Sequence, residues 1–116
     1  MKKILTCVNV TSSNEPTALH AAEELTKYLQ KKGVDIREDG FAVLVAVDPS
    51  LEEDGYKIEA TESGLTIKGD NTGVLYGVYA FLEKYAGIRF FTPTLEVCPA
   101  GDIEIGEGVL MEYTPA

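Results

Sequence analysis

The chain has 116 residues, 45% hydrophobic and 25% charged, a balance typical of one globular domain and not of a disordered or membrane-embedded chain. Nineteen acidic residues against ten basic ones give a formal net charge of −9, and surplus negative charge repels phosphate backbones and anionic lipids. We therefore expect neither nucleic acid nor membrane as a partner, and nothing in the composition requires a metal, a cofactor or a disulfide framework.

Residues 1–13 begin like a secretory signal but do not continue like one. Lys2 and Lys3 precede Ile4 and Leu5, and polar residues then arrive before an apolar stretch of adequate length. We expect no signal peptide in this sequence, so its location has to follow from a parent protein.

The first third predicts a strand and then a helix. Residues 3–10 alternate enough to form a strand. Pro16 suits a first helical turn, where its missing N–H would be unpaired, and Gly33 can end the helix at about Lys32. One apolar face repeats at helical spacing, formed by Ala18, Ala22, Leu25 and Leu29.

The middle third predicts four strands. Residues 34–37 are a short one, and residues 41–47 are apolar throughout, which favours a central strand covered on both faces. Residues 56–60 and 65–68 alternate apolar and polar side chains, and the turn 61–64 joins them as a hairpin.

The sequence predicts that the chain is organised around a second helix between Asn71, which can cap its start, and Gly87, which can end it. Gly77 lies mid-helix, where glycine costs about 1 kcal/mol relative to alanine, so we expect close approach to a sheet there. Residues 88–91 look extended, and 103–105 and 109–113 are short terminal strands. We expect an α+β fold, with a mixed, largely antiparallel sheet and two helices packed on one face.

Chemically reactive groups are few. His20, the single histidine, falls beside the apolar stripe of the first helix, and a solvated helical side chain is the favoured interpretation. The carboxylates at 52–54, 102 and 104 are interpreted as surface or edge-strand groups and not as a glycosidase acid and base. Residues 69–73 suggest phosphate binding, but turn and capping chemistry explains them fully. Cys7 is expected to be a small buried hydrophobe, and a Cys7–Cys98 disulfide stays open as the alternative.

A family resemblance rests on the second helix and its flanks. Asn-Thr-Gly-Val-Leu-Tyr-Gly-Val-Tyr-Ala-Phe-Leu-Glu (71–83), followed by Gly-Ile-Arg-Phe-Phe (87–91), resembles the accessory N-terminal domain of alpha-glucuronidases and beta-hexosaminidase-like glycoside hydrolases. The similarity extends to Ala21–Leu25 in the first helix, and Phe90 stands where many relatives have tryptophan.

The resemblance implies one non-catalytic domain, residues 1–116, in which 113–116 begin a linker to a catalytic barrel of the same polypeptide. The parent would be a secreted or periplasmic glycoside hydrolase, and this domain would buttress the barrel without catalytic residues of its own. Two alternatives stay open: a carbohydrate-binding module that uses exposed aromatics, and a free-standing small enzyme.

Aromatic residues cluster where the resemblance ends. We expect interdomain or ligand contacts through Tyr76, Arg89, Phe90, Phe91 and Tyr113, and weak homodimerisation of the isolated domain through the last four of these.

Overall fold

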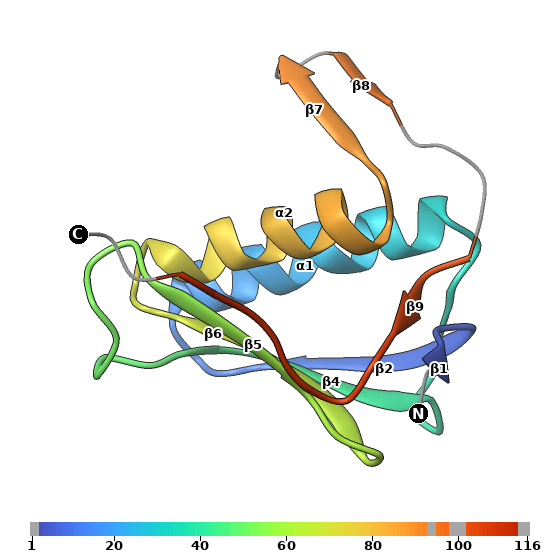
Figure 1. Cartoon of the computed structure of the whole chain (residues 1–116), viewed down its shortest axis with the longest axis horizontal. Helices are drawn as coiled ribbons and strands as arrows, with labels where there is room; N and C mark the ends of the chain where they lie inside the picture. The colour runs from blue at the N-terminus through green and yellow to red at the C-terminus, as the bar shows by residue number, and fades with distance from the viewer. Residues whose placement is uncertain (1–2, 93–94, 98–101, 114–116) are drawn as a thin grey trace.

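The computed structural model describes the backbone of residues 3–92, 95–97 and 102–113, and the side chains of residues 3–88 and 102–113. Two helices, α1 (Pro16–Lys31) and α2 (Gly73–Tyr85), lie side by side over a twisted sheet (Figure 1). None of the helices in these residues is long and apolar enough to cross a membrane.

The main sheet of the described residues has six strands. Their spatial order is β10 (Gly108–Tyr113), β5 (Tyr56–Ala60), β6 (Gly64–Gly69), β4 (Phe41–Val47), β2 (Cys7–Ser12) and β3 (Asp35–Ile36). Two short pairs stand apart from it: β1 (Lys3–Ile4) with β9 (Glu104–Ile105), and β7 (Arg89–Thr92) with β8 (Leu95–Val97).

The predicted α+β fold, with a mixed sheet and both helices on one face, is confirmed. Antiparallel pairing joins β10 to β5 and β5 to β6, including the predicted hairpin. The pairs β6–β4, β4–β2 and β2–β3 are parallel, so parallel pairs outnumber antiparallel ones in this sheet, and the expectation that it is largely antiparallel is not met. Parallel neighbours need a crossover connection, and α1 supplies one between β2 and the strands that follow it.

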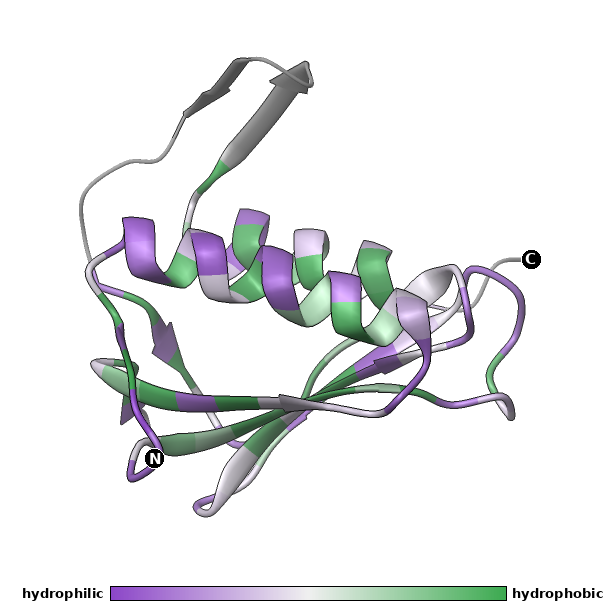
Figure 2. Ribbon diagram, turned by 180° about the vertical axis from the view of Figure 1, so that it is seen from behind, coloured by the Kyte–Doolittle hydropathy of each residue, from purple (hydrophilic) through white to green (hydrophobic). Residues whose placement is uncertain are grey.

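The core lies between the sheet and the helices. Alternate strand residues point into it and are fully buried, among them Val8, Val43, Val45, Ile58, Leu65 and Ile67. They meet the inner helix faces, which include Leu25, Leu29, Val78, Phe81 and Leu82. Figure 2 shows the helices stacked on one side of the sheet, with α1 banded between hydrophobic and hydrophilic residues.

The opposite face of β4 corrects a prediction. This strand is central, as expected, but it is not covered on both sides, because Ala42 is exposed and Leu44 keeps 39% of its surface accessible. Both helices lie on the other face, and among the described residues no second layer covers this one. The apolar run 41–47 thus correctly predicted that β4 is central, but it wrongly predicted that both faces of this strand are buried.

Glycines allow α2 to lie close to the sheet. A Cβ on Gly77 would stand 3.1 Å from Cβ of Tyr56 and 3.2 Å from Cγ2 of Ile67, which confirms the predicted close approach. At the start of the helix, a Cβ on Gly73 would clash with the carbonyl oxygen of Gly55. Gly87 has a φ of 71°, as expected of the glycine that ends this helix.

Candidate interdomain and ligand-contact site

The start of α2 is held by Asp70 and not, as the sequence suggested, by Asn71. One carboxylate oxygen of Asp70 accepts the backbone N–H groups of Gly73 at 2.6 Å, Thr72 at 3.2 Å and Asp54 at 3.0 Å. The hydroxyl of Thr72 also donates to the carboxylate of Asp54. Because a carboxylate already accepts the N–H groups of Thr72 and Gly73, where an anion would otherwise bind, these bonds support the capping interpretation of residues 69–73.

A pocket of about 400 Å³ lies at the edge of the sheet, and a second one of about 350 Å³ lies between the N-terminal ends of the two helices. The second pocket is lined by Pro16, Thr17, His20, Asn71, Thr72, Leu75 and Tyr76. The Thr17 hydroxyl donates to Oδ1 of Asn71 at 2.9 Å and ties α1 to the loop that precedes α2. Asn71, which the sequence suggested as the cap, is therefore a hydrogen-bond partner of α1 in the lining of this pocket.

Two polar and aromatic side chains stand at the mouth of this pocket. Tyr76 is 52% exposed on α2, although it is a large aromatic. The side chain of His20 is 57% exposed, and its Nε2 lies 3.9 Å from Oε1 of Glu24, so the solvated helical interpretation of His20 is confirmed.

Helix α2 is apolar around its circumference over most of its length. Leu75, Tyr79 and Ala80 are half-buried beside the exposed Tyr76, and charged residues appear only at Glu83 and Lys84 near the end of the helix. A helix that is apolar all round is typical of one covered on every side. We call Leu75, Tyr76, Tyr79 and Ala80 the α2 surface.

Among the five predicted contact residues, the structure describes the side chains of Tyr76 and Tyr113. Tyr113 is 49% exposed at the end of β10, and its ring stacks on Tyr56 with centroids 5.5 Å apart. Tyr56 in turn lies beneath Gly77 of α2. The backbone of Arg89, Phe90 and Phe91 belongs to β7, and their side chains lie outside the described residues.

The Tyr56 hydroxyl is the group of this region whose ionisation is perturbed. Burial raises the pKa of Tyr56, and the neighbouring Tyr113 and Glu83 raise it further. Two carboxyl groups have pKa values that are shifted downward. Hydrogen bonds from Ser50 lower the pKa of Asp48, and a hydrogen bond from Ser13 lowers the pKa of Glu15. A general acid in a glycosidase needs a raised carboxyl pKa, which is the opposite direction.

The other reactive groups are placed as follows. Glu52, Glu53, Asp102 and Glu104 are exposed, in agreement with their interpretation as surface groups, whereas Asp54 takes part in the cap of α2. Within the described part of the chain, no group of three or more His, Cys, Asp or Glu residues could hold a metal ion. Cys7 is a half-buried free thiol, and Cys98 lies outside the described residues.

The sequence places Leu75 and Tyr79 on the apolar face of this helix, and both are half-buried and pack against the core. Ala80 is half-buried as well, and the signal that singles out this helix is the absence of any charged residue between Gly73 and Leu82. Sequence reasoning missed Thr17, because a contact between residues 17 and 71 depends on tertiary packing.

No protein-family model matches the sequence, and no curated protein is similar to it. Solved structures are similar in fold. An inactive mutant of the GH20 exo beta-N-acetylglucosaminidase from Vibrio harveyi superposes with a TM-score of 0.63, at 16% identity over 99% of this chain and 18% of that one. This fold occurs within glycoside hydrolases.

Two further glycoside hydrolases support the same conclusion about the fold. CpGH84B matches 94% of this chain and 19% of its own length, with a TM-score of 0.57 and 16% identity. A GH138 enzyme that targets pectin rhamnogalacturonan II matches 67% of this chain and 13% of its own, with a TM-score of 0.58 and 19% identity. The chain thus spans less than a fifth of each of these three glycoside hydrolases.

Proposed function

We propose that this chain is the non-catalytic accessory domain of a glycoside hydrolase, and that it buttresses a catalytic barrel downstream in the same polypeptide. The observation that carries the proposal is the α2 surface, where Tyr76 is 52% exposed beside the half-buried Leu75, Tyr79 and Ala80, on a helix with no charged side chain before Glu83. The small share of each similar glycoside hydrolase that this fold occupies, 13–19% in the structures above, leaves ample chain for such a barrel.

The pocket beside the α2 surface suits an interdomain contact. Pro16, Leu75 and Tyr76 give it apolar walls, and Thr17, His20 and Asn71 supply hydrogen-bonding groups. An apolar side chain of the barrel would fill this volume of about 350 Å³, with Tyr76 packed against it. Arg89, Phe90, Phe91 and Tyr113 are proposed as further contacts, with residues 113–116 as the start of the linker.

The resemblance to alpha-glucuronidases is part of this proposal, as is a secreted or periplasmic parent. Both depend on the identity of the barrel, and reading the gene beyond residue 116 tests them directly. A continuing frame of about 250 residues or more with alternating strand and helix patterns supports the proposal. A stop codon directly after Ala116 contradicts it.

The interface itself is tested by binding. We expect this chain to bind the separately produced downstream domain, and Tyr76→Lys to weaken that binding strongly because a charge would be buried in an apolar contact. Glu62→Lys, on the exposed hairpin between β5 and β6, is the matched control and should leave binding unchanged. Equal affinities for Tyr76→Lys and the unmodified chain would show that the α2 surface is not the interface.

Carbohydrate binding is the second candidate function, and the exposure of Tyr76 beside a pocket with hydroxyl, amide and imidazole groups favours it. Aromatic rings stack on sugars, and neighbouring polar groups bind their hydroxyls. Calorimetric titration with chitin and xylan fragments separates the two candidates. Saturable heat that disappears in Tyr76→Ala or Phe91→Ala would establish the binding module in place of the buttress.

A further inference from the structure

The two edges of the six-stranded sheet differ in how they are protected. At one edge, β10 changes register between Val109 and Met111 and carries the exposed Glu112, and bulges and charges are features that keep edge strands from pairing. At the other edge, the two-residue β3 pairs only with Cys7 and Val8 of β2. No strand of the described residues pairs with that side of β2 over Asn9–Ser12, which contains no proline, charge or bulge.

Backbone alternation shows which groups face the open side. On the β3 side, the carbonyls of Thr6 and Val8 accept N–H groups of Asp35 and Arg37 at 2.9 and 2.8 Å. Since the backbone groups of successive strand residues alternate in direction, those of Val10 and Ser12 also point to the β3 side. Val10 and Ser12 therefore present two N–H and two C=O groups at an edge that β3 does not reach.

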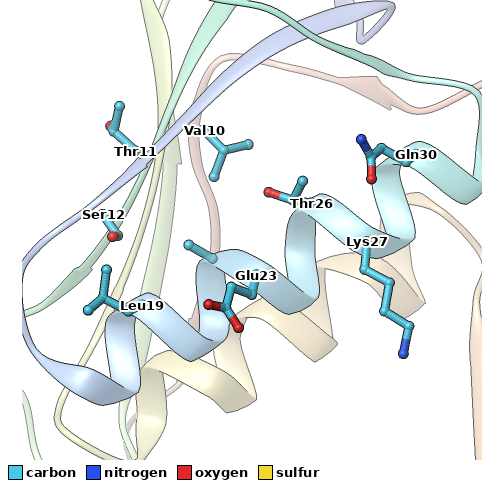
Figure 3. A pocket seen from close by; sticks show the side chains of 9 residues that line it. Val10, Thr11, Ser12, Leu19, Glu23, Thr26, Lys27 and Gln30 are labelled. Carbon is cyan, nitrogen blue, oxygen red and sulfur yellow. The ribbon is translucent and has the colours of Figure 1, made fainter.

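A groove of about 400 Å³ runs beside this edge, between β2 and the flank of α1 (Figure 3). Val10 and Thr26 point toward one another across it, and Leu19 stands next to Ser12. Leu19 is 48% exposed, which is unusual for leucine on a helix that otherwise packs well. We call the free edge 9–12 together with this flank of α1 the edge groove.

We propose that two copies of this chain associate through their edge grooves about a two-fold axis. The two β2 edges then pair antiparallel, with Val10 of each copy opposite Ser12 of the other. Because the backbone N–H and C=O groups of both residues point to the open side, both pairs of opposing residues can exchange hydrogen bonds. Four N–H···O=C bonds form, and the two main sheets become continuous. The same axis lays the two α1 helices antiparallel, each over the groove of the other.

Charge complementarity favours a second copy over another occupant. Glu23 and Lys27 lie one turn apart on the exposed flank of α1, and Figure 3 shows both side chains extending outward from the helix. A two-fold axis reverses the direction of the second helix, so Lys27 of one copy meets Glu23 of the other, twice. Lys27 also lies 4.0 Å from Glu24 of its own helix, but its side chain is 53% exposed and can reach a partner.

Small side chains between these charges allow the helices to approach. Ala22 and Thr26 line the groove at the level where the helices cross, and neither projects far from α1. Each chain carries a formal charge of −9, so the copies repel one another at long range. We therefore expect a weak dimer. Its dissociation constant should fall as added salt screens the net repulsion, and should stop falling once the salt also screens the Glu23–Lys27 pairs.

A charge swap tests the proposal. Sedimentation equilibrium should show Glu23→Lys and Lys27→Glu each weakening dimerisation about tenfold or more, because like charges then face each other. The double variant E23K/K27E should restore it, since the opposite charges are again paired. Glu53→Lys, on an exposed loop, changes the net charge exactly as Glu23→Lys does and should not weaken the dimer.

A backbone variant tests the strand pairing independently. Ser12→Pro removes one N–H from the free edge while leaving the bonds to β4 in place, so the chain should stay folded by circular dichroism and lose the dimer. A chain that stays monomeric at all concentrations would refute the proposal. So would a dimer that survives all these changes, or one that Phe91→Ala disrupts and the charge reversals do not.

Discussion

Single atoms decide how closely α2 approaches the sheet. Gly73 and Gly77 have no Cβ. A Cβ at Gly73 would clash with the carbonyl oxygen of Gly55, and one at Gly77 would crowd the Cβ of Tyr56. A helical glycine is unfavourable by itself, and here its cost is offset by the contacts that the close approach allows to Ile67 and Tyr56.

Replacing these glycines should therefore destabilise the domain strongly. We expect Gly77→Leu to lower the free energy of unfolding by about 1 to 3 kcal/mol or more, through overpacking against Tyr56 and Ile67. Gly106→Ala is the matched control, because a Cβ there meets nothing within 4 Å. His20→Ala should also change little, since the imidazole is exposed. Urea unfolding measures all three, and equal midpoints for Gly77→Leu and the unmodified chain would contradict this packing.

The cap of α2 offers a second test at the same scale. Asp70→Ala leaves the first N–H groups of the helix without their carboxylate and should cost about 0.5 to 2 kcal/mol of stability. Asn71→Ala removes only the exposed hydrogen bond with Thr17 and should cost clearly less. If thermal unfolding shows that Asn71→Ala loses more stability than Asp70→Ala, then Asn71 and not Asp70 is the cap of α2.

At the scale of elements, the stacked pair Tyr56–Tyr113 joins β5 to β10 beneath α2. The ring of Tyr56 packs under the helix at Gly77, and burial is the main cause of the raised pKa of its hydroxyl. The neutral form of this phenol is therefore favoured in the folded chain.

This pKa shift predicts alkaline sensitivity. The folded-state pKa of Tyr56 lies above its ordinary value of 10.0, so its contribution to stability is complete below pH 10 and is lost as the pH rises toward the folded-state pKa. Tyr56→Phe has no ionisable hydroxyl and should lose less stability than the unmodified chain between pH 9 and 11. Parallel stability curves for the two proteins in denaturant titrations would show that Tyr56 is not the group responsible.

For the whole molecule, the described residues form one layer of two helices on one sheet, and the open face of that sheet is largely polar at one end. Lys57 and Lys68 there lie 3.6 to 3.9 Å from Glu59, Glu112 and Asp48 in a chain of surface ion pairs. Such pairs suit contact with water. The exposed Tyr76 lies instead on α2, beside the half-buried Leu75, Tyr79 and Ala80, and this grouping is why the interface is proposed there.

The proposed function predicts that the chain alone hydrolyses no glycoside. Incubation with aryl glucuronides and aryl N-acetylhexosaminides should release no chromophore above the background rate, because a glycosidase needs two carboxyl groups with separated pKa values. Turnover that disappears when one of the chain's own carboxylates, such as Asp102 or Glu104, is replaced by its amide would overturn the buttress proposal in favour of a small enzyme.

The sequence by itself determined the helices, the hairpin and the central position of β4, because those depend on periodicity and turn residues along one stretch of chain. It also predicted the close approach at Gly77, since a mid-helix glycine needs compensation. Tertiary structure alone decided that the carboxylate of Asp70, which caps α2, also accepts the N–H of Asp54, sixteen residues earlier. It likewise decided that Leu44 faces solvent and that β2 keeps a free edge, because burial and strand pairing depend on which elements come together in space.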